Sequence, residues 1–495
     1  MSDTSWKDFL GNTSLHGVRY LTENSFIRRV IWLLVVLAAF CGFGYQLYKS
    51  ITFYYEWPTV TAMTTEWDEE LDFPAVTICN LNTLSKENFV KARKRYKSDA
   101  TTEQLEKEVE TFTFFMSAPL NENAKSKLLN DFFENSTSYR ERGNFVNKSL
   151  NDFSHSIDGI LSIKWLRPCQ FSGEDCDRKN FSSFVDLNFG LCHTFNSGKK
   201  EENALKVESL GPNNGLRLRL NVQQEDHVSN FYWLPAGFKV LVHDRKEYPI
   251  MEQTGFALQP GTHTFCSTKL KKYKNLPTPY NTKCGENITD FNRYFSVNYS
   301  MSTCGKQCLH DYGIKKCGCQ PIYPITKGVP LCALNDTFEC IYPTYYGKFP
   351  REAAECFKKY CPVPCDYTKY ETKLSYASAI SNALARSLPT HLTESKDVAD
   401  AFSDIQNMTE QERKRFFREN VATLDVYFEE LSYDKIEQKP SFDSWSLIGN
   451  IGGYLGLFLG MSVLTVMEFL DLLVIKFLNR ISGTKTRVTT IQVGS

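Results

Sequence analysis

The sequence has no excess of charge of either sign and no catalytic signature. Its 495 residues include 57 basic and 57 acidic side chains, whereas nucleic-acid-binding proteins usually show a basic excess. We therefore expect no nucleic-acid partner. The histidines are few and scattered, and the chain lacks a phosphate-binding loop, a Gly-x-Ser-x-Gly turn and a His-Glu-x-x-His pair. We expect no enzyme activity, no cofactor and no metal site. An ectoenzyme is an alternative that no motif supports.

The chain also lacks internal repeats and low-complexity linkers, but it contains two long apolar segments. The first runs from Val30 to Tyr48 and the second from about Trp445 to Ile475. Each is close to the ~20 apolar residues that a membrane-spanning helix needs. We therefore predict two transmembrane helices, at residues 30–50 and 441–475. The other predicted parts are an N-terminal segment (1–29), one large outer region (51–440) and a C-terminal tail (476–495).

Basic residues predict the orientation in the membrane. Arg28 and Arg29 precede the first segment, and the second is followed by Lys476, Arg480, Lys485 and Arg487. The positive-inside rule then places both termini in the cytoplasm of a multi-pass plasma-membrane protein. A cleaved signal peptide is the alternative for the first segment, which is too long and lacks a small-residue cleavage site. Asn-X-Ser/Thr sequons in the outer region predict glycosylation at Asn135, Asn147, Asn180, Asn287, Asn298, Asn335 and Asn407.

Cysteine is abundant in the outer region. Cys41 lies in the first apolar segment, and the remaining 15 of the 16 cysteines lie between the two segments. In an oxidising compartment the expected state is disulfides, each of which typically stabilises a fold by ~2–4 kcal/mol. A zinc cluster in the dense run from Cys304 to Cys319 is the weaker alternative. Because 15 is odd, one outer cysteine should be unpaired.

Hydrophobic periodicity in the outer region predicts a mixed α+β structure. Alternation of apolar and polar residues predicts strands at Gly215–Val222, Gly237–His243 and Val421–Phe428. Predicted helices are Lys86–Tyr96, Thr102–Phe115, Ala124–Phe133, Pro350–Lys359 and Thr409–Arg418.

The second apolar segment is unlike a simple anchor. Gly452, Gly456 and Gly460 recur every four residues, and Gly449 and Gly453 form a parallel pair. Small residues at this spacing let helices approach closely in lipid. A carboxylate at bilayer depth costs at least ~2.5–3.5 kcal/mol unless it faces water or a partner. We therefore predict a symmetric assembly around an aqueous path, with acidic rings that attract cations. The alternative places the acids at the inner interface. The polar residues concerned are Asn450, Ser462, Glu468 and Asp471.

At the level of motifs, the chain resembles a known family along nearly its whole length. The motifs are His16–Gly17, Phe73–Asn82, Gly190–Asn196, Leu276–Tyr280, Tyr299–Cys319, Leu424–Glu430, Ile436–Gln438 and Gly452–Gly460. Their order and spacing resemble the epithelial sodium channel, degenerin and acid-sensing ion channel superfamily, closest to the acid-sensing and peptide-gated branch. The resemblance implies an amiloride-sensitive channel for cations, mainly sodium ions. It further implies a homo- or heterotrimer of two-helix subunits with a hand-like outer domain of palm, finger, thumb, knuckle and β-ball.

The resemblance also implies the disulfide pairing and the pore residues. The implied bridges, which leave Cys266 unpaired, are Cys79–Cys192, Cys169–Cys176, Cys284–Cys365, Cys304–Cys361, Cys308–Cys356, Cys317–Cys340 and Cys319–Cys332. The implied selectivity residues are Gly460, Met461 and Ser462, and the implied pore-lining residues are Asn450, Gly453, Glu468 and Asp471. The resemblance also implies that the second helix becomes extended at the belt formed by Gly460, Met461 and Ser462. His16 and Gly17 would belong to a re-entrant loop below that belt, near the constriction and important for gating.

Several positions depart from the family pattern. Met461 replaces a small residue of the Gly-X-Ser belt, which puts fine sodium selectivity in doubt. Asn450 stands where acid-sensing relatives carry an aspartate, so block by divalent ions should be weaker. The Trp57-Pro58-Thr59 stretch replaces a histidine-bearing one.

Other departures concern gating. Tyr280 replaces a tryptophan whose loop is thought to contact the first helix near Tyr54, Tyr55 and Trp57. The Leu431-Ser432 pair stands where relatives have the linker that is tied to desensitisation. The acidic pocket of acid-sensing members is only partly matched, by Glu225 and Asp226 on one side and by Glu352 and Glu355 on the facing helix.

The sequence leaves several candidates for the stimulus that opens the channel. A proton trigger needs carboxyl groups whose pKa values are raised toward neutrality, and the acidic pocket is incomplete. A short extracellular neuropeptide is slightly favoured as the ligand, and proton gating is the alternative. Constitutive or mechanical opening is the third possibility. A non-conducting receptor or adhesion ectodomain is the remote alternative. Besides sodium ions, sister subunits and that ligand, the expected partner is membrane lipid.

Overall fold

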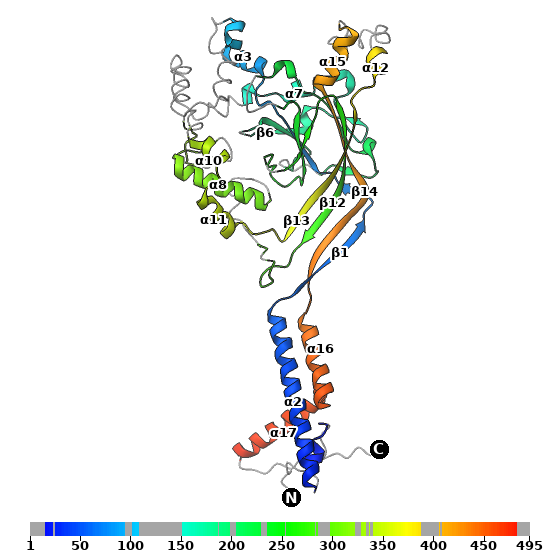
Figure 1. Ribbon diagram of the computed structural model, residues 1–495, viewed down its shortest axis with the longest axis vertical. Helices are drawn as coiled ribbons and strands as arrows, with labels where there is room; N and C mark the ends of the chain where they lie inside the picture. The colour runs from blue at the N-terminus through cyan, green and yellow to red at the C-terminus, as the bar shows by residue number, and fades with distance from the viewer. Residues whose placement is uncertain are drawn as a thin grey trace. The chain divides into compact units, whose positions relative to one another are not determined.

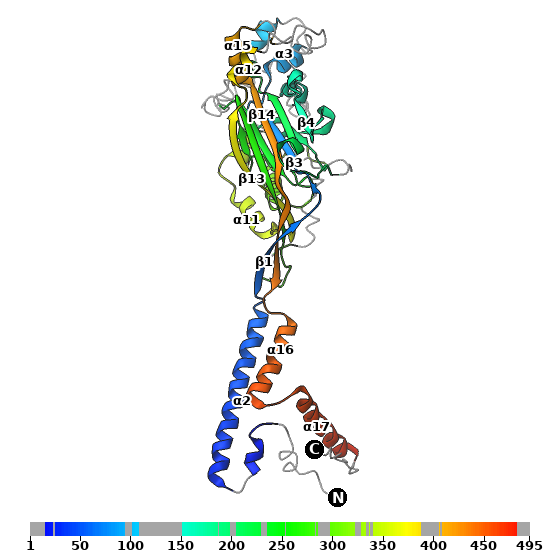
Figure 2. The same ribbon diagram turned by 90° about the vertical axis from the view of Figure 1, so that its right-hand side faces the viewer.

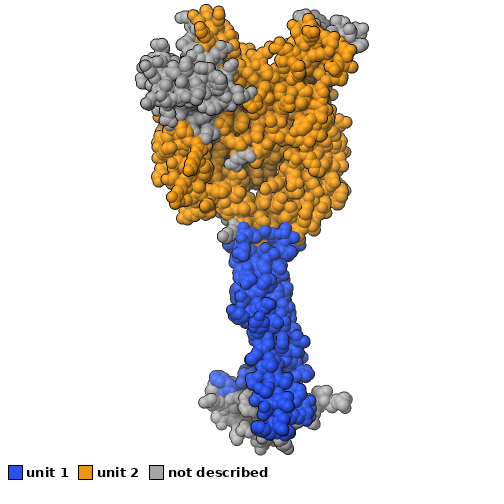
Figure 3. Space-filling view, in the orientation of Figure 1, with its two compact units in different colours: residues 1–61, 278–282, 438–495 blue, residues 62–277, 283–437 orange. Residues whose placement is uncertain are grey.

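The computed structural model describes most of the chain as two compact units (Figure 3). Unit 1 comprises residues 1–61, 278–282 and 438–495, and unit 2 comprises residues 62–277 and 283–437. The described residues are 15–22, 25–94, 101–107, 151–186, 188–198, 204–228, 235–252, 254–282, 284–285, 298–321, 328–332, 336, 340–387, 405 and 408–482. The predicted helix Ala124–Phe133 and most of Thr102–Phe115 lie outside them.

Unit 1 is built around one long apolar helix and a bent pair of helices. Helix α2 (Phe26–Tyr55) exceeds the predicted segment at both ends and is long and apolar enough to cross a membrane. It runs beside α16 (Ser444–Tyr454), from which α17 (Val463–Ser482) turns away (Figure 2). The span predicted over 441–475 is thus bent by 78° at the break that the family resemblance implied, and α17 extends beyond the predicted end at residue 475. Among the described residues of unit 1, the other elements are η1 (Val18–Thr22) and the π-helical turn η8 (Leu455–Leu459).

Unit 2 contains two large sheets (Figure 1). The seven-stranded sheet has the order β13-β12-β14-β9-β4-β5, with β1 also paired to β14, and the five-stranded sheet has the order β11-β10-β3-β7-β6. The first sheet consists of β1 (Thr59–Trp67), β4 (Cys169–Phe171), β5 (Glu174–Asp175), β9 (Leu216–Asn221), β12 (Thr262–Lys274), β13 (Asp366–Ser378) and β14 (Val421–Pro440). The second consists of β3 (Ala75–Asn80), β6 (Phe181–Asp186), β7 (Gly190–Phe195), β10 (Phe238–His243) and β11 (Phe256–Leu258), while β2 (Leu71–Asp72) pairs with β8 (Lys206–Val207).

The main core lies between these two sheets. Leu216, Leu218 and Leu220 alternate along β9 and are fully buried. They share one cluster with Val76 and Ile78 of β3. Every residue of β3 is buried, because a further apolar cluster packs on the other face of its sheet. The alternating strands predicted from sequence are thus those that face one apolar layer.

Helices surround the sheets at several points. They are α3 (Lys86–Lys94), α7 (Ile157–Ile160), α8 (Met301–Cys317), α10 (Tyr342–Tyr346), α11 (Arg351–Tyr360), α12 (Asn382–Ser387) and α15 (Glu410–Asn420), with short turns η2 (Lys164–Leu166), η3 (Arg178–Asn180), η4 (Pro212–Asn214) and η5 (Gln224–Asp226). The helix predicted at Pro350 begins one residue later, with that proline as its N-cap.

Seven disulfides hold unit 2 together, and their pairing is the one that the family resemblance implied. Cys304 and Cys308, one turn apart on α8, are bridged to Cys361 and Cys356, so that α8 and α11 are joined twice. Among the described cysteines, Cys41 and Cys266 are free. Cys266 is fully buried in the main core, and burial raises the pKa of its thiol to about 12.

Candidate functional site

The break between η8 and α17 is the candidate pore element in unit 1. Residues 460–462 are not helical, and Gly460 has a left-handed conformation with φ of +62°. The amides of Gly460 and Met461 still donate to the carbonyl groups of Gly456 and Leu455. After the break, Ser462 and Thr465 exchange hydrogen bonds between side chains and backbone amides, which caps the start of α17. The three residues of the predicted Gly-X-Ser belt therefore form the bend itself.

The His16-Gly17 motif contacts this bend. The His16 amide donates to the Leu459 carbonyl at 3.0 Å. A Cβ atom added to Gly460 would lie 1.4 Å from Nδ1 of His16, so only glycine fits there. Gly17 has φ of +84°, and an added Cβ would lie 3.0–3.1 Å from Val36 and Trp32 of α2. The His16-Gly17 turn therefore lies between the bend and helix α2.

The glycine face of α16 and the following η8 is open within the chain. A Cβ atom at Gly449, Gly452, Gly453 or Gly456 would meet no described atom within 4 Å. Close packing in unit 1 instead joins η8 to α2. A Cβ added to Gly42 of α2 would lie 2.9 Å from Cε1 of Phe458. The predicted lining residues Asn450, Glu468 and Asp471 are exposed in the single chain. These positions are therefore free to line a path or contact another subunit.

Four aromatic residues of the predicted gating region form one cluster in unit 1. The ring of Trp57 lies 5.3 Å from Tyr54, 6.4 Å from Tyr55 and 5.4 Å from Tyr280, in each case between ring centroids. Trp57 has a left-handed backbone with φ of 51°, directly after α2 ends. The contact expected between the Tyr280 loop and the end of the first helix is thus present.

Leu431 and Ser432 lie in a bulge of β14. Between the pairs Thr268–Phe428 and Leu270–Tyr433, β12 has one residue and β14 has four. The Ser432 side chain is buried and donates to Glu430 at 2.9 Å. The Leu431 carbonyl accepts from the Asp68 amide at 3.1 Å. The predicted desensitisation linker is therefore part of a long strand with a local irregularity.

The two halves of the expected acidic pocket have different neighbours. Asp226 accepts from the Glu87 amide at 2.6 Å, and burial raises the pKa of its carboxyl group. Glu225 and Asp226 line a cavity of about 470 Å³ together with residues of α3, among them Lys86, Lys91 and Lys94. In contrast, Glu352 and Glu355 are exposed on α11, which packs against α8. The described residues therefore do not bring the four acids together.

Two histidines beside Asp226, the buried His155 and the half-buried His227, were not predicted. Nδ1 of His155 lies 3.8 Å from Asp226 Oδ2, and its ring lies 5.5 Å from that of His227. Burial lowers the pKa of both rings to about 4, so both are neutral at pH 7. Scattered positions in the sequence gave no signal of this cluster.

Two further carboxyl sites were also missed. Asp186, at the end of β6, is buried, and Lys306 of α8 places its Nζ 3.8 Å from Asp186 and 3.1 Å from Glu252. Burial raises the pKa of Asp186, against the opposing effect of Lys306. Glu247 follows β10, and burial together with Asp244 raises its pKa to about 7. Both sites depend on tertiary packing that spacing does not reveal.

Two of the predicted glycosylation sites lie among the described residues. Asn180 and Asn298 are exposed. The other five sequons lie outside the described residues, at Asn135, Asn147, Asn287, Asn335 and Asn407. Glycosylation at all seven sites stays a prediction.

A long apolar helix, a bent apolar helix pair and a large disulfide-rich unit define the chain as a membrane protein with a folded ectodomain. A helix interrupted at a glycine turn is a feature of membrane proteins in which non-helical backbone lines a water-filled cavity. The comparison with known families makes the class specific. The family model described as the amiloride-sensitive sodium channel matches residues 9–472, and the chain belongs to this family of sodium-conducting ion channels.

Individual relatives are acid-sensing channels. The chain is 30% identical over 504 residues to acid-sensing ion channel 1C of Danio rerio, covering 98% of this chain and 86% of that protein. It is 29% identical over 486 residues to acid-sensing ion channel 1B of the same species, covering 96% and 78%. It is 27% identical over 489 residues to acid-sensing ion channel 2 of Homo sapiens, covering 95% and 86%.

Proposed function

We propose that three copies of the chain, or of the chain with sister subunits, form an amiloride-sensitive cation channel in the plasma membrane. Helix α2 and the bent α16–α17 pair serve as the two spans of each subunit, residues 62–437 lie outside the cell, and both termini are cytoplasmic. The second spans line the pore, with Gly460, Met461 and Ser462 at the selectivity belt. Asn450, Gly453, Glu468 and Asp471 face the aqueous path.

The single observation that carries this proposal is the His16-Gly17 turn on the helix break. The hydrogen bond from His16 to Leu459 stabilises a bend that leaves backbone groups outside any helix. Such groups are tolerable at membrane depth only where they face protein or water. The open glycine face of α16 supports the three-fold assembly, because small residues allow close approach of a neighbouring helix.

For the stimulus, we propose extracellular protons. The relatives named above are acid-sensing, and three buried or half-buried carboxyl groups, Asp186, Asp226 and Glu247, have raised pKa values. Glu247, whose pKa is raised to about 7, titrates in the physiological range. Protons open a channel only if the open state binds them more tightly than the closed state. No described residue favours the neuropeptide alternative, which stays a prediction.

Expression in oocytes tests both parts of the proposal. We expect an inward sodium current that amiloride blocks and that an acid step from pH 7.4 to pH 5.5 evokes. A cysteine introduced by Ser462→Cys should make this current sensitive to a charged thiol reagent, while Ser444→Cys, at the start of α16, serves as the control. Monomeric purified protein, or a Ser462→Cys current that the reagent leaves unchanged, would contradict the pore assignment. A peptide-evoked current without any acid response would replace protons by the peptide.

A further inference from the structure

Three neighbouring strands of unit 2 place two lysines side by side. In the parallel pairing of β12 with β14, Lys272 lies opposite Lys435. In the antiparallel pairing of β12 with β13, Lys272 lies opposite Thr368. Residues opposite each other on paired strands point to the same face of a sheet, in which neighbouring strands lie about 4.7–4.9 Å apart. This row, which we call the lysine row, therefore holds two ammonium groups and one hydroxyl group but no carboxylate.

The neighbouring row on the same face has its own acids, so the lysine row is unusual. Two residues further along, Lys274 lies opposite Glu437 and Asp366, and its Nζ is 3.8 Å from Glu437. Like charges directly opposite each other destabilise a sheet. Within the lysine row, Lys435 reaches Glu66 of β1 at 3.3 Å. Lys272 instead lies 3.6 Å from the ring centroid of Tyr433, and no carboxylate of the described residues comes within 4 Å of its Nζ.

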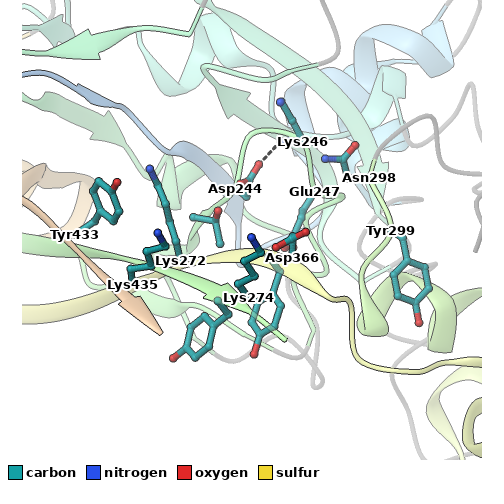
Figure 4. A pocket seen from close by; sticks show the side chains of 13 residues that line it. Asp244, Lys246, Glu247, Lys272, Lys274, Asn298, Tyr299, Asp366, Tyr433 and Lys435 are labelled. Carbon is teal, nitrogen blue, oxygen red and sulfur yellow. Dashed lines mark hydrogen bonds between the residues drawn. The ribbon is translucent and has the colours of Figure 1, made fainter. Parts of the chain in front are cut away.

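The lysine row lines a pocket of about 380 Å³ (Figure 4). On the opposite side the pocket is bounded by the segment from Asp244 to Glu247 after β10, and by Asn298 and Tyr299 before α8. Figure 4 shows the lysines of the sheet gathered near this segment. The size is that of a pocket for a small molecule, typically ~300–1,000 Å³.

We propose that this pocket binds the divalent phosphate or sulfate group of a small soluble molecule. Lys272 and Lys435 each supply a positive charge, and the Thr368 hydroxyl group supplies a neutral donor. Lys246 also lines the pocket, but its ammonium group is exposed and directed away from the lysine row (Figure 4). Lysine is a common ligand of phosphate groups. A doubly charged anion cancels the repulsion within the lysine row, and the remaining volume accommodates an organic group beside Tyr433.

Glu247 makes the affinity of this pocket depend on pH. Its carboxyl group faces the pocket together with Asp244 and Asp366, while the surrounding ammonium groups are those of Lys246, Lys272, Lys274, Lys369 and Lys435. Burial raises the pKa of Glu247 to about 7, repulsion by Asp244 acts in the same direction, and Lys369 acts against them. Glu247 is therefore mainly ionised at pH 8, where it repels an anion, and mainly neutral at pH 6. Anion affinity should rise as the pH falls.

Calorimetric titration of the full-length channel in detergent tests the proposal. Sodium sulfate is the probe, because its charge stays constant between pH 6 and pH 8, and sodium chloride at matched ionic strength is the reference. We expect saturable binding that is roughly three- to tenfold tighter at pH 6 than at pH 8, as removal of one nearby unit charge implies. Glu247→Gln should bind at pH 8 as tightly as the native channel binds at pH 6.

Matched lysine variants assign the binding to the lysine row. Lys272→Gln should weaken sulfate binding at least about tenfold, and Lys272→Arg should restore it, because the charge returns. Lys271→Gln removes the same charge from the opposite face of β12, where Lys271 pairs with Glu371 at 2.7 Å, and should leave binding unchanged. Equal loss in both glutamine variants, or no saturable binding by the native channel, would overturn the proposal. Unfolding temperatures in chloride identify any variant that fails to fold.

Two further titrations test which molecule occupies the pocket. The titration is repeated after enzymatic removal of N-glycans, because Asn298 of a predicted sequon lies at the rim of the pocket. Glycerol phosphate is compared with sulfate, and we expect it to bind at least as tightly. Binding of sulfate but not of glycerol phosphate would overturn the assignment to a small molecule and restrict the site to a free ion. Because no current is recorded, a failure here is independent of the proposed gating by protons.

Discussion

Replacement of Lys306 by methionine should destabilise unit 2 strongly. In the structure Lys306 is the only ammonium group within 4 Å of both Asp186 and Glu252 among the described residues. Its side chain is 13% exposed and that of Asp186 is 1% exposed. Oδ2 of Asp186 has no hydrogen-bond partner among the described residues. Lys306→Met therefore leaves the buried Asp186 carboxyl group without its cation and close to Glu252, whose side chain is 26% exposed.

The expected magnitude follows from burial. Removing one partner of a buried ion pair typically costs ~3–5 kcal/mol, whereas an exposed pair contributes only ~0–1 kcal/mol. Lys373→Met is the matched control, because Lys373 pairs with Glu429 at 2.8 Å with side-chain exposures of 71% and 36%. The Lys306 variant should lower the apparent unfolding temperature by roughly 5 °C or more, and the control by about 1 °C or less.

The pH dependence gives a sharper test. The pKa of Asp186 is already raised by burial, and loss of Lys306 removes the main opposing effect, so the pKa rises further. A carboxyl group with a raised pKa in the folded state contributes most stability at low pH, and this contribution is lost as the pH rises through that pKa. Fluorescence-detected thermal unfolding of the purified channel should therefore show a larger defect at pH 8 than at pH 5. Equal shifts for Lys306→Met and Lys373→Met, or a defect independent of pH, would refute the reasoning.

Three further predictions concern current. Gly460→Ala should reduce the amiloride-sensitive current and alter the ratio of sodium to potassium permeability, because a left-handed residue with a side chain costs ~1–2 kcal/mol and the added Cβ meets His16. Gly44→Ala in α2, where an added Cβ meets no described atom within 4 Å, is the control and should pass a larger current than Gly460→Ala; equal currents would argue against the His16 contact. Glu247→Gln imitates the protonated side chain, so the half-activating pH of the acid-evoked current should move toward neutrality. The control Glu352→Gln on α11 should leave this pH unchanged, and an unchanged half-activating pH in Glu247→Gln would exclude Glu247 as a sensor. Tyr280→Ala removes an aromatic contact with Trp57 worth ~0.5–1.5 kcal/mol and should change the rate of current decay, which Tyr280→Trp should restore. Identical decay in the native channel and both variants would show that the aromatic cluster does not contribute to gating.

The sequence was most informative where local patterning and tertiary structure agree. The alternation at Gly215–Val222 and Gly237–His243 predicted β9 and β10 within one residue at each end, because one face of each strand lies on the core. The strand predicted at Val421–Phe428 is the first part of β14, whose remaining residues to Pro440 are mostly polar. Helix α8 was not predicted, because its cysteines and scattered polar residues give no apolar stripe of helical period.

For the candidate site, the motifs located the bend, and the family resemblance placed the His16-Gly17 loop near it, but the individual contacts were not predicted. The glycine spacing and the Gly-X-Ser residues identified the second span, while the seating of His16 against Gly460 joins residues more than 400 positions apart. Asp186 and Glu247 were missed for a related reason, whereas Asp226 was predicted from its match to the acidic pocket. The pKa values of all three carboxyl groups are raised by burial, and a sequence alone does not show which side chains become buried.

The unpaired Cys266 has a practical consequence for spectroscopy. Thiol-reactive dyes and spin labels attack the thiolate, and a side chain with no solvent exposure and a pKa raised to about 12 offers almost none at neutral pH. Site-directed labelling should therefore need only the substitution of Cys41, with every disulfide of the ectodomain left intact. A reporter attached at a chosen loop would then follow opening in real time against a silent background.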